Sequence, residues 1–186
     1  MIPSDHFVRF YNEVFKFLDE RGALEPYYKE ISRHQEMHCL ELFRREGLKG
    51  VMKYYEKIRF EENCGLEMEF LSDRLVSRMT ACPSLAKVLD SDAAPCAKYC
   101  DHCAGWSAPL YTKCGIYYIE NIVSRSEPRC ISVRTESREV AQEVYRKFLA
   151  EAAAPDLVKS NLGDWREVEK NRALRNSGNA GKGKNV

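Results

Sequence analysis

The spacing of hydrophobic and polar positions along this chain changes near residue 64. Before that point, apolar residues recur every three to four positions, which is typical of amphipathic helices. This pattern predicts helices at about 4–20, 26–45 and 51–61. From residue 66, apolar and acidic residues alternate, as they do in a half-buried strand. The remainder of the chain predicts two β-hairpins, with strands at 66–70, 75–81, 116–123 and 130–135.

A helix that carries cysteines is expected between the two hairpins. Ser91 and Asp92 can cap its first turn, and Pro95 is tolerated there because the first turn leaves backbone N–H groups unbonded. Gly105 and Pro109 are expected to limit its length. Further helical segments are expected at 84–89, at about 136–152 and around Trp165.

These elements predict one α+β domain over residues 1–175. It has a helical N-terminal part at about 4–62 and a mixed part at about 64–154. The two antiparallel hairpins form a small sheet, flanked by the N-terminal helices, the cysteine-bearing central helix and a C-terminal helix. Residues 176–186 are mostly glycine, asparagine and lysine, so a disordered tail is expected there.

The composition indicates which cellular compartment and which kinds of binding partner to expect. The formal net charge is only +1 over 186 residues, which gives no electrostatic reason to expect binding to nucleic acid or to a membrane surface. No apolar run is as long as a membrane span, and the first ten residues lack the apolar core of a secretory signal. A cytoplasmic protein is therefore expected. Its eight cysteines would then stay reduced and indicate metal binding or thiol chemistry.

Three cysteines share one face of the expected central helix. Cys96, Cys100 and Cys103 lie at positions i, i+4 and i+7, which predicts a metal site with soft sulfur ligands. A 4Fe–4S cluster and zinc both fit this ligand type, with a fourth ligand from elsewhere in the chain. The alternative is structural, because cysteine also packs as a small buried hydrophobe.

A thiolate nucleophile would need a base near it. His102 follows Cys100 closely, but residues on a helix that are not three or four apart do not face each other. A histidine from another helix, His34 or His38, is therefore the expected partner.

Four stretches of the chain resemble the L-2-amino-thiazoline-4-carboxylic acid hydrolase family. They read R-H-Q-E-M-H-C-L-E-L-F-R-R-E-G-L-K-G, M-T-A-C-P-S-L-A-K-V-L-D, Y-C-D-H-C and E-P-R-C-I-S-V-R. Cys82, Cys100 with Asp101, and Cys130 match the cysteine positions of that family. The resemblance covers about half of the chain, and Cys96, His102 and Cys103 are additions to its pattern.

The resemblance implies a small-molecule enzyme that opens a sulfur-containing ring by hydrolysis to give a carbamoyl-cysteine product. Cys100 is the expected nucleophile or metal ligand, with Cys82 and Cys130 beside it. Arg78 and Arg134 are expected to bind the substrate carboxylate, because guanidinium grips carboxylate in a fork. The expected catalytic residues are Cys100, Cys82, Cys130, Asp101 and His38. The alternative function is an iron–sulfur or zinc-binding accessory module without hydrolase activity.

Overall fold

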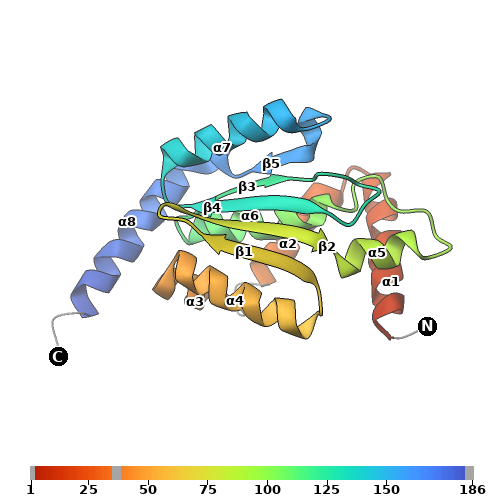
Figure 1. The fold of residues 1–186 in the computed structure, drawn as a ribbon, viewed down its shortest axis with the longest axis horizontal. Helices are drawn as coiled ribbons and strands as arrows, with labels where there is room; N and C mark the ends of the chain where they lie inside the picture. Colours follow the sequence, from red (N-terminus) through yellow and green to blue (C-terminus); the bar gives the residue numbers. More distant parts are fainter. Residues whose placement is uncertain (1–2, 35–38, 183–186) are drawn as a thin grey trace.

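The computed structural model describes residues 3–34 and 39–182, which form an α+β fold (Figure 1). In chain order the elements are α1 (Pro3–Asp19), α2 (Leu24–His34), α3 (Glu41–Glu46), α4 (Leu48–Glu61), β1 (Gly65–Phe70), β2 (Arg74–Ala81), α5 (Pro83–Leu89), α6 (Asp101–Lys113), β3 (Tyr117–Asn121), β4 (Cys130–Thr135), α7 (Arg138–Glu151), η2 (Pro155–Leu157), β5 (Val158–Ser160), η3 (Leu162–Asp164) and α8 (Trp165–Lys182).

The sheet has the strand order β1-β2-β4-β3-β5, and its neighbouring strands are antiparallel. Both predicted hairpins are confirmed, and the pairing of β2 with β4 joins them into one sheet. Ser77 lies opposite Ser132 in that pairing. The edge strand β5 was not predicted. It has three residues, too few to show the period of a strand in the sequence.

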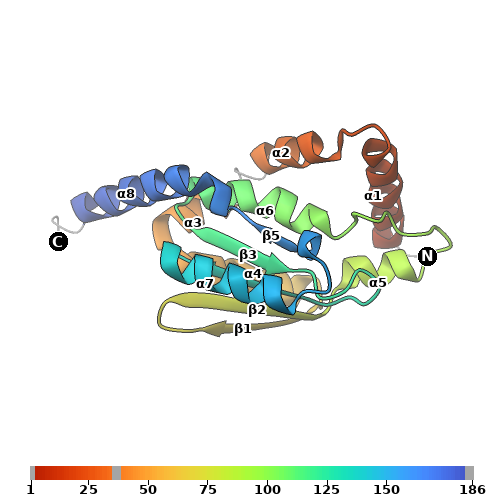
Figure 2. The same ribbon diagram turned by 90° about the horizontal axis from the view of Figure 1, so that it is seen from above.

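Helices cover both faces of the sheet. The helix α7 lies along β3 and β4 on one face, where the buried side chains are apolar (Figure 1). On the other face, α6 lies against β3, and α4 lies against β1 and β2 (Figure 2). The apolar side chains of the α7 face include Val76, Tyr117, Ile119 and Val133 from the strands, and Ala141, Val144 and Phe148 from the helix.

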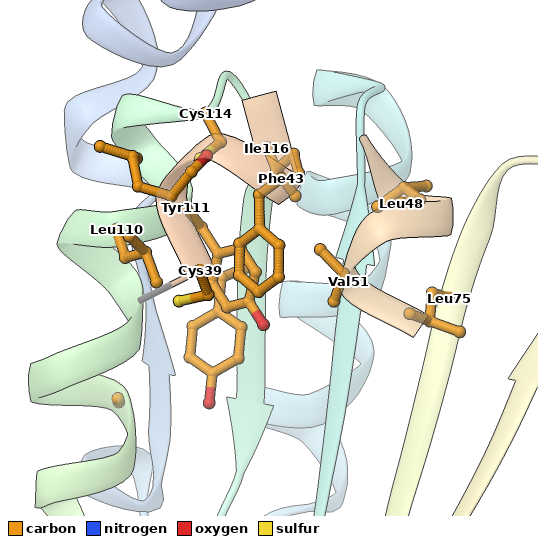
Figure 3. Packing of buried hydrophobic residues seen from close by; sticks show 12 residues of the cluster. Cys39, Phe43, Leu48, Val51, Leu75, Leu110, Tyr111, Cys114 and Ile116 are labelled. Carbon is orange, nitrogen blue, oxygen red and sulfur yellow. The ribbon is translucent and has the colours of Figure 1, made fainter. Parts of the chain in front are cut away.

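The other face holds an apolar core only at one end, where α3, α4 and α6 meet (Figure 3). Phe43 and Tyr111 stack there, with ring centroids 5.7 Å apart and ring planes 3° from parallel. Val51, Leu75 and Ile116 surround this pair and are fully buried. This packing fixes the distance between α4 and α6, and the space between them toward the other end of the sheet remains available for a cavity.

The central helix begins later than the sequence predicts. Asp101 is its first residue, so Cys96 lies before α6 and Cys100 lies at its N-cap. The side chain of Asn12 holds the preceding segment: it donates to the Ala94 carbonyl at 3.0 Å and accepts from the Cys96 N–H at 2.7 Å. Pro95 also favours an extended conformation in the residue before it. The predicted single helical face of three cysteines is therefore wrong.

The same helix continues through Gly105 and Pro109, where the sequence predicted a limit. Gly105 is required by packing, because a Cβ there would lie 2.7 Å from the Cβ of Tyr28. The hydroxyl of Ser32 also donates to the Trp106 carbonyl at 2.7 Å. These contacts place α2 against the side of α6 that is turned away from the sheet (Figure 2).

Two other expectations differ from the structure. Residues 176–182 belong to α8, where a disordered tail was expected; the helix starts at a packed segment with a fully buried Val168 and continues past it. The predicted helix at 26–45 corresponds to α2 and α3, and residues 35–38 lie outside the described part.

No helix within the described residues is long and apolar enough to cross a membrane.

We expect Gly105→Ala to lower the free energy of unfolding by about 1–3 kcal/mol, because Tyr28 or the α2 backbone must move to admit the methyl group. The matched control is Gly163→Ala, where a Cβ would meet no atom within 4 Å. Urea unfolding of both variants measures the difference. Equal stability of the two variants would contradict the close approach of α2 to α6.

Candidate functional site

The face of the sheet that lies under α4 and α6 carries polar side chains around a cavity of about 270 Å³. Alternate residues of a strand point to the same face, so Glu120, Ser132 and Arg134 share this face with Ser77. Helical side chains close the cavity from above. The helical lining includes Tyr54, Tyr55, Ile58, His102, Cys103, Trp106 and Ser107.

Arg134 is the buried positive charge of this cavity. Its side chain belongs to a residue that is only 4% exposed, and its Nη1 donates to the Ser77 hydroxyl at 2.6 Å. Its Nε donates to the Tyr111 hydroxyl at 3.2 Å. The guanidinium lies 4.8 Å from the centroid of the Tyr55 ring and 5.4 Å from that of Tyr118, within cation–π range.

No carboxylate in the described part of the chain forms an ion pair with Arg134, and its Nη2 has no hydrogen-bond partner there. Burial raises the pKa of Tyr111 and Tyr118 well above the ordinary value, so both rings stay neutral. They orient the guanidinium but do not cancel its charge. The residue therefore offers an unused donor and a full positive charge to an anion in the cavity.

Glu120 is the buried acid of the same cavity. It is 3% exposed, and its Oε2 has no hydrogen-bond partner among the described residues. Burial raises the pKa of this carboxyl to about 7, although the charge of Arg134 and hydrogen bonds from Tyr118 and Cys130 act in the opposite direction. A carboxyl with this pKa can both accept and donate a proton near neutral pH.

Sequence reasoning missed Glu120. The signal was a single acidic residue inside the apolar run Y-Y-I-E-N-I, where an ion is costly unless it has a role or a partner.

The three family-pattern cysteines lie around one small space. Cys82 is the N-cap of α5, Cys100 is the N-cap of α6, and Cys130 is the first residue of β4. Together with Cys103 and Glu120 they line a cavity of about 30 Å³, which has room for water but not for a substrate. Of these thiols, only Cys103 and Cys130 also line the larger cavity.

Burial is the main cause of raised thiol pKa values at this site. It raises the pKa of Cys100 to about 12, and it raises the pKa of Cys82, Cys103 and Cys130 as well. Repulsion by Glu120 contributes at all of these positions. The thiols are therefore protonated at neutral pH, and any nucleophilic role requires a base.

The expected metal ligands do not form a common site. Cys96 is buried with Phe15, Leu85 and Tyr99 in an apolar cluster near α1 and α5, against which Cys100 also packs, whereas Cys103 lines the larger cavity. Within residues 3–34 and 39–182, no group of three or more His, Cys, Asp or Glu side chains is arranged to hold a metal ion. The arrangement of these cysteines does not fit the cluster or zinc site that their spacing predicted, because helix α6 starts after Cys96.

The remaining predicted residues lie outside the cavity. Arg78 lies on the opposite face of β2 from Ser77, where its side chain is 45% exposed and pairs with Glu69. Asp101 forms ion pairs with Arg125 at 2.8 Å and with Lys159 at 3.1 Å, which tie the start of α6 to the β3–β4 loop and to β5. His38 lies outside the described residues. His34 is on the surface, beside Glu30.

His102 and Cys103 form the closest thiol–imidazole contact of the site. The Sγ of Cys103 lies 3.4 Å from the Nε2 of His102, and the Nδ1 of His102 contacts the Tyr99 carbonyl. Burial lowers the pKa of His102, so the neutral ring is the stable form. Sequence reasoning placed the base on another helix because neighbouring residues diverge by about 100° on a helix. Both residues lie in the first turn of α6, and both reach the same cavity.

Comparison of the chain with models of protein families, with curated proteins and with solved structures gives no match.

We expect Glu120 to make stability depend on pH in a defined direction. Between the unfolded pKa of about 4.5 and the folded pKa of about 7, the folded state keeps a proton that the unfolded chain has released. Stability therefore falls as pH rises through this window, by on the order of 3 kcal/mol for this carboxyl. Glu120→Gln removes this contribution.

The measurement is urea unfolding of the wild type and of Glu120→Gln at several pH values from 4.5 to 8. The wild type should lose stability relative to the variant as pH rises. The contribution of His102 runs the other way, because its pKa is lowered, and it cancels between the two proteins. A difference that stays constant over the whole range would contradict a raised pKa at Glu120.

Proposed function

We propose that this protein is an enzyme that binds a small carboxylate substrate in the cavity of about 270 Å³ and hydrolyses a bond beside Glu120. The observation that carries the proposal is the pairing of opposite groups in one buried cavity. Among the described residues, Arg134 is a positive charge with no carboxylate in an ion pair, and Glu120 is an acid with one oxygen that has no hydrogen-bond partner. A buried charge and a buried unsatisfied oxygen both destabilise a fold, so a bound ligand supplies the compensation that the described residues do not.

The substrate carboxylate would bind the free Nη2 of Arg134, with the Tyr55, Tyr111 and Tyr118 rings around the guanidinium. Aromatic walls favour a flat or ring-shaped substrate, since they offer apolar area and ring faces at low entropic cost. The volume of about 270 Å³ suits a small metabolite better than a peptide or a nucleic acid strand. These features support a substrate of the class that the hydrolase resemblance implies.

Glu120 would then be the proton-transfer residue. A carboxyl with a pKa near the working pH can take a proton from the attacking group and return it to the leaving group. Glu120 and the substrate would face the same cavity, so the proton could pass between them directly. The cysteine thiols Cys103 and Cys130 lie on the same walls.

The alternative function, an iron–sulfur or zinc-binding module, depends on a common position for Cys96, Cys100 and Cys103. In the described structure Cys96 and Cys100 pack in one apolar cluster, Cys103 lines the larger cavity, and no group of three His, Cys, Asp or Glu side chains is arranged to hold a metal ion. We instead interpret the cysteines on the cavity walls as groups that take part in thiol chemistry in a hydrolase-like enzyme.

We expect small cyclic carboxylic acids to stabilise the wild type against thermal unfolding, whereas their amides should not. A ligand at 100 times its dissociation constant adds about 2.7 kcal/mol to stability. Pyroglutamate and its amide form a suitable pair, as do nicotinate and nicotinamide. Arg134→Met should abolish the difference between acid and amide, and Arg134→Lys should restore part of it.

Arg78→Met is the matched control, because Arg78 lies on the opposite face of the sheet. It should retain the full difference between acid and amide. Equal stabilisation of the wild type by acids and amides would contradict the role of Arg134.

We expect the protein to add one water to L-2-amino-thiazoline-4-carboxylate, followed as a mass change and as release of a free thiol or carbamoyl product. Glu120→Gln should lower kcat by about 10²-fold or more, the usual contribution of a general acid–base group. Glu69→Gln, on the exposed face of β1, is the control and should retain activity. Full activity in Glu120→Gln would rule out this residue as the proton-transfer group.

A further inference from the structure

Three thiols line the cavity, Cys39, Cys103 and Cys130, and Cys103 lies against the imidazole of His102. The Nδ1 of His102 contacts the Tyr99 carbonyl, which can only accept a hydrogen bond. The ring proton therefore sits on Nδ1, and Nε2 is an acceptor. That acceptor is the atom 3.4 Å from the Sγ of Cys103.

The imidazole is held in this orientation by aromatic rings. Trp106 lies 4.8 Å from it between ring centroids, Tyr99 lies at 5.0 Å, and Phe15 lies at 5.6 Å. The ring thus has a fixed direction in addition to a fixed tautomer. A nucleophile, a base and a group that orients the base form the arrangement used in covalent catalysis. Here the orienting group is a backbone carbonyl.

The cysteines Cys82, Cys100 and Cys130 are placed differently. Cys82 and Cys100 face only the cavity of about 30 Å³, which is too small for a substrate. Cys130 faces the substrate cavity, and its neighbour there is the Glu120 carboxyl, diagonally across the sheet from it. Cys103 faces the substrate cavity and has the imidazole beside it.

We propose that Cys103 is the nucleophile of this enzyme and that His102 is its general base, acting on a carbon that is doubly bonded to nitrogen or oxygen in a small carboxylate. This inference rests on the proposed function. It departs from the sequence expectation, in which Cys100 was the nucleophile and the base came from another helix.

The reaction consists of two substitutions at the same carbon, first by Sγ of Cys103 and then by water. The Cys103 proton moves to Nε2 of His102 while Sγ bonds to the substrate carbon, whose double-bond electrons shift to nitrogen or oxygen. The double bond then re-forms, the substrate's sulfur leaves, and it takes the proton from His102. Water next attacks the carbon that Cys103 holds, with Glu120 accepting its proton. The double-bond electrons shift again as water adds and return as the bond to Sγ breaks. Sγ then takes the proton from Glu120, and the second proton of the water stays on the product.

The first turn of α6 suits the charge that develops on sulfur. Cys103 is the third residue of the helix, where the dipole and the unbonded N–H groups favour a negative charge. The thiol stays neutral until a substrate occupies the cavity, because the surroundings are apolar and Glu120 is near.

Competitive alkylation tests this assignment without a known substrate. Iodoacetate carries the carboxylate that Arg134 would bind, whereas iodoacetamide is neutral and of nearly equal size. Each cysteine of the folded wild-type protein is quantified by peptide mass spectrometry over time with each reagent. Cys64, which does not line either cavity, gives the baseline ratio of the two rates.

We expect Cys103 to be the first cavity thiol labelled by iodoacetate, with a ratio of iodoacetate to iodoacetamide rates at least about tenfold above that of Cys64. His102→Gln should slow labelling at Cys103 about 10²-fold, the size of a general-base effect. His34→Gln is the matched control on the surface and should leave the rate unchanged.

Preferential labelling of Cys130 or Cys100, or no labelling of any cavity thiol by either reagent, would overturn the assignment. Arg134→Met separates this inference from the proposed function. If Cys103 reacts first and depends on His102, but its reagent ratio is the same in the wild type and in Arg134→Met, the nucleophile stands and the carboxylate anchor fails.

Discussion

The buried guanidinium of Arg134 is the constraint on which the cavity depends. Arginine cannot lose its charge inside a protein, so the fold has to accommodate a full positive charge away from water. Within the described part of the chain, ring faces and hydroxyls surround this charge, and no carboxylate forms an ion pair with it. Tyr55 comes from α4, Tyr111 from α6 and Tyr118 from β3, so the guanidinium connects both helices to the sheet. The same contacts hold the walls of the cavity apart and keep one edge of the arginine free.

Stability and chemistry are divided between the two faces of the sheet. The face under α7 is apolar and closely packed, and Ile119 and Ala141 are fully buried there. The face under α4 and α6 places serines, an acid and an arginine where a core would otherwise form. Such a polar face costs stability, and proteins retain local violations of this kind mainly at functional sites. The stacked pair of Phe43 and Tyr111 closes the apolar end of that face and compensates locally.

The sequence was sufficient to predict the four strands of the two hairpins and the α+β class, because alternation in 66–70 and turn residues between strands are local signals. The start of α6 was not predictable in this way. It depends on Asn12, which lies 84 residues from Cys96 and accepts a hydrogen bond from its backbone N–H. A helical-wheel analysis of Cys96, Cys100 and Cys103 assumes a helix that begins early, and the metal site followed from that assumption.

The candidate site, like the fold, was predictable where the signal is local and was not predictable where it depends on distant parts of the chain. The sequence predicted Arg134 as a site residue because it lies on a strand with a family-pattern cysteine, and it predicted Arg78 for the same reason. Their difference arises from the register of β2, in which Ser77 and not Arg78 faces α6. Glu120 was missed because an acid in a strand usually lies on a solvated face, and β5 covers that edge of the sheet without a clear sequence pattern.

Burial of several thiols beside one acid limits how the site can react. Ionising any one of them places a negative charge near Glu120 in a medium of low polarity, which burial and repulsion both oppose. A permanent thiolate is therefore unfavourable at neutral pH. Proton transfer within the site is the remaining route, since it moves charge over a short distance without creating net charge. His102 is buried as the neutral ring beside a neutral thiol, so its contact with Cys103 meets this requirement at the cavity wall. The same apolar surroundings that suppress the resting thiolate also strengthen its attraction to the imidazolium formed with it, because interactions between charges are least screened there.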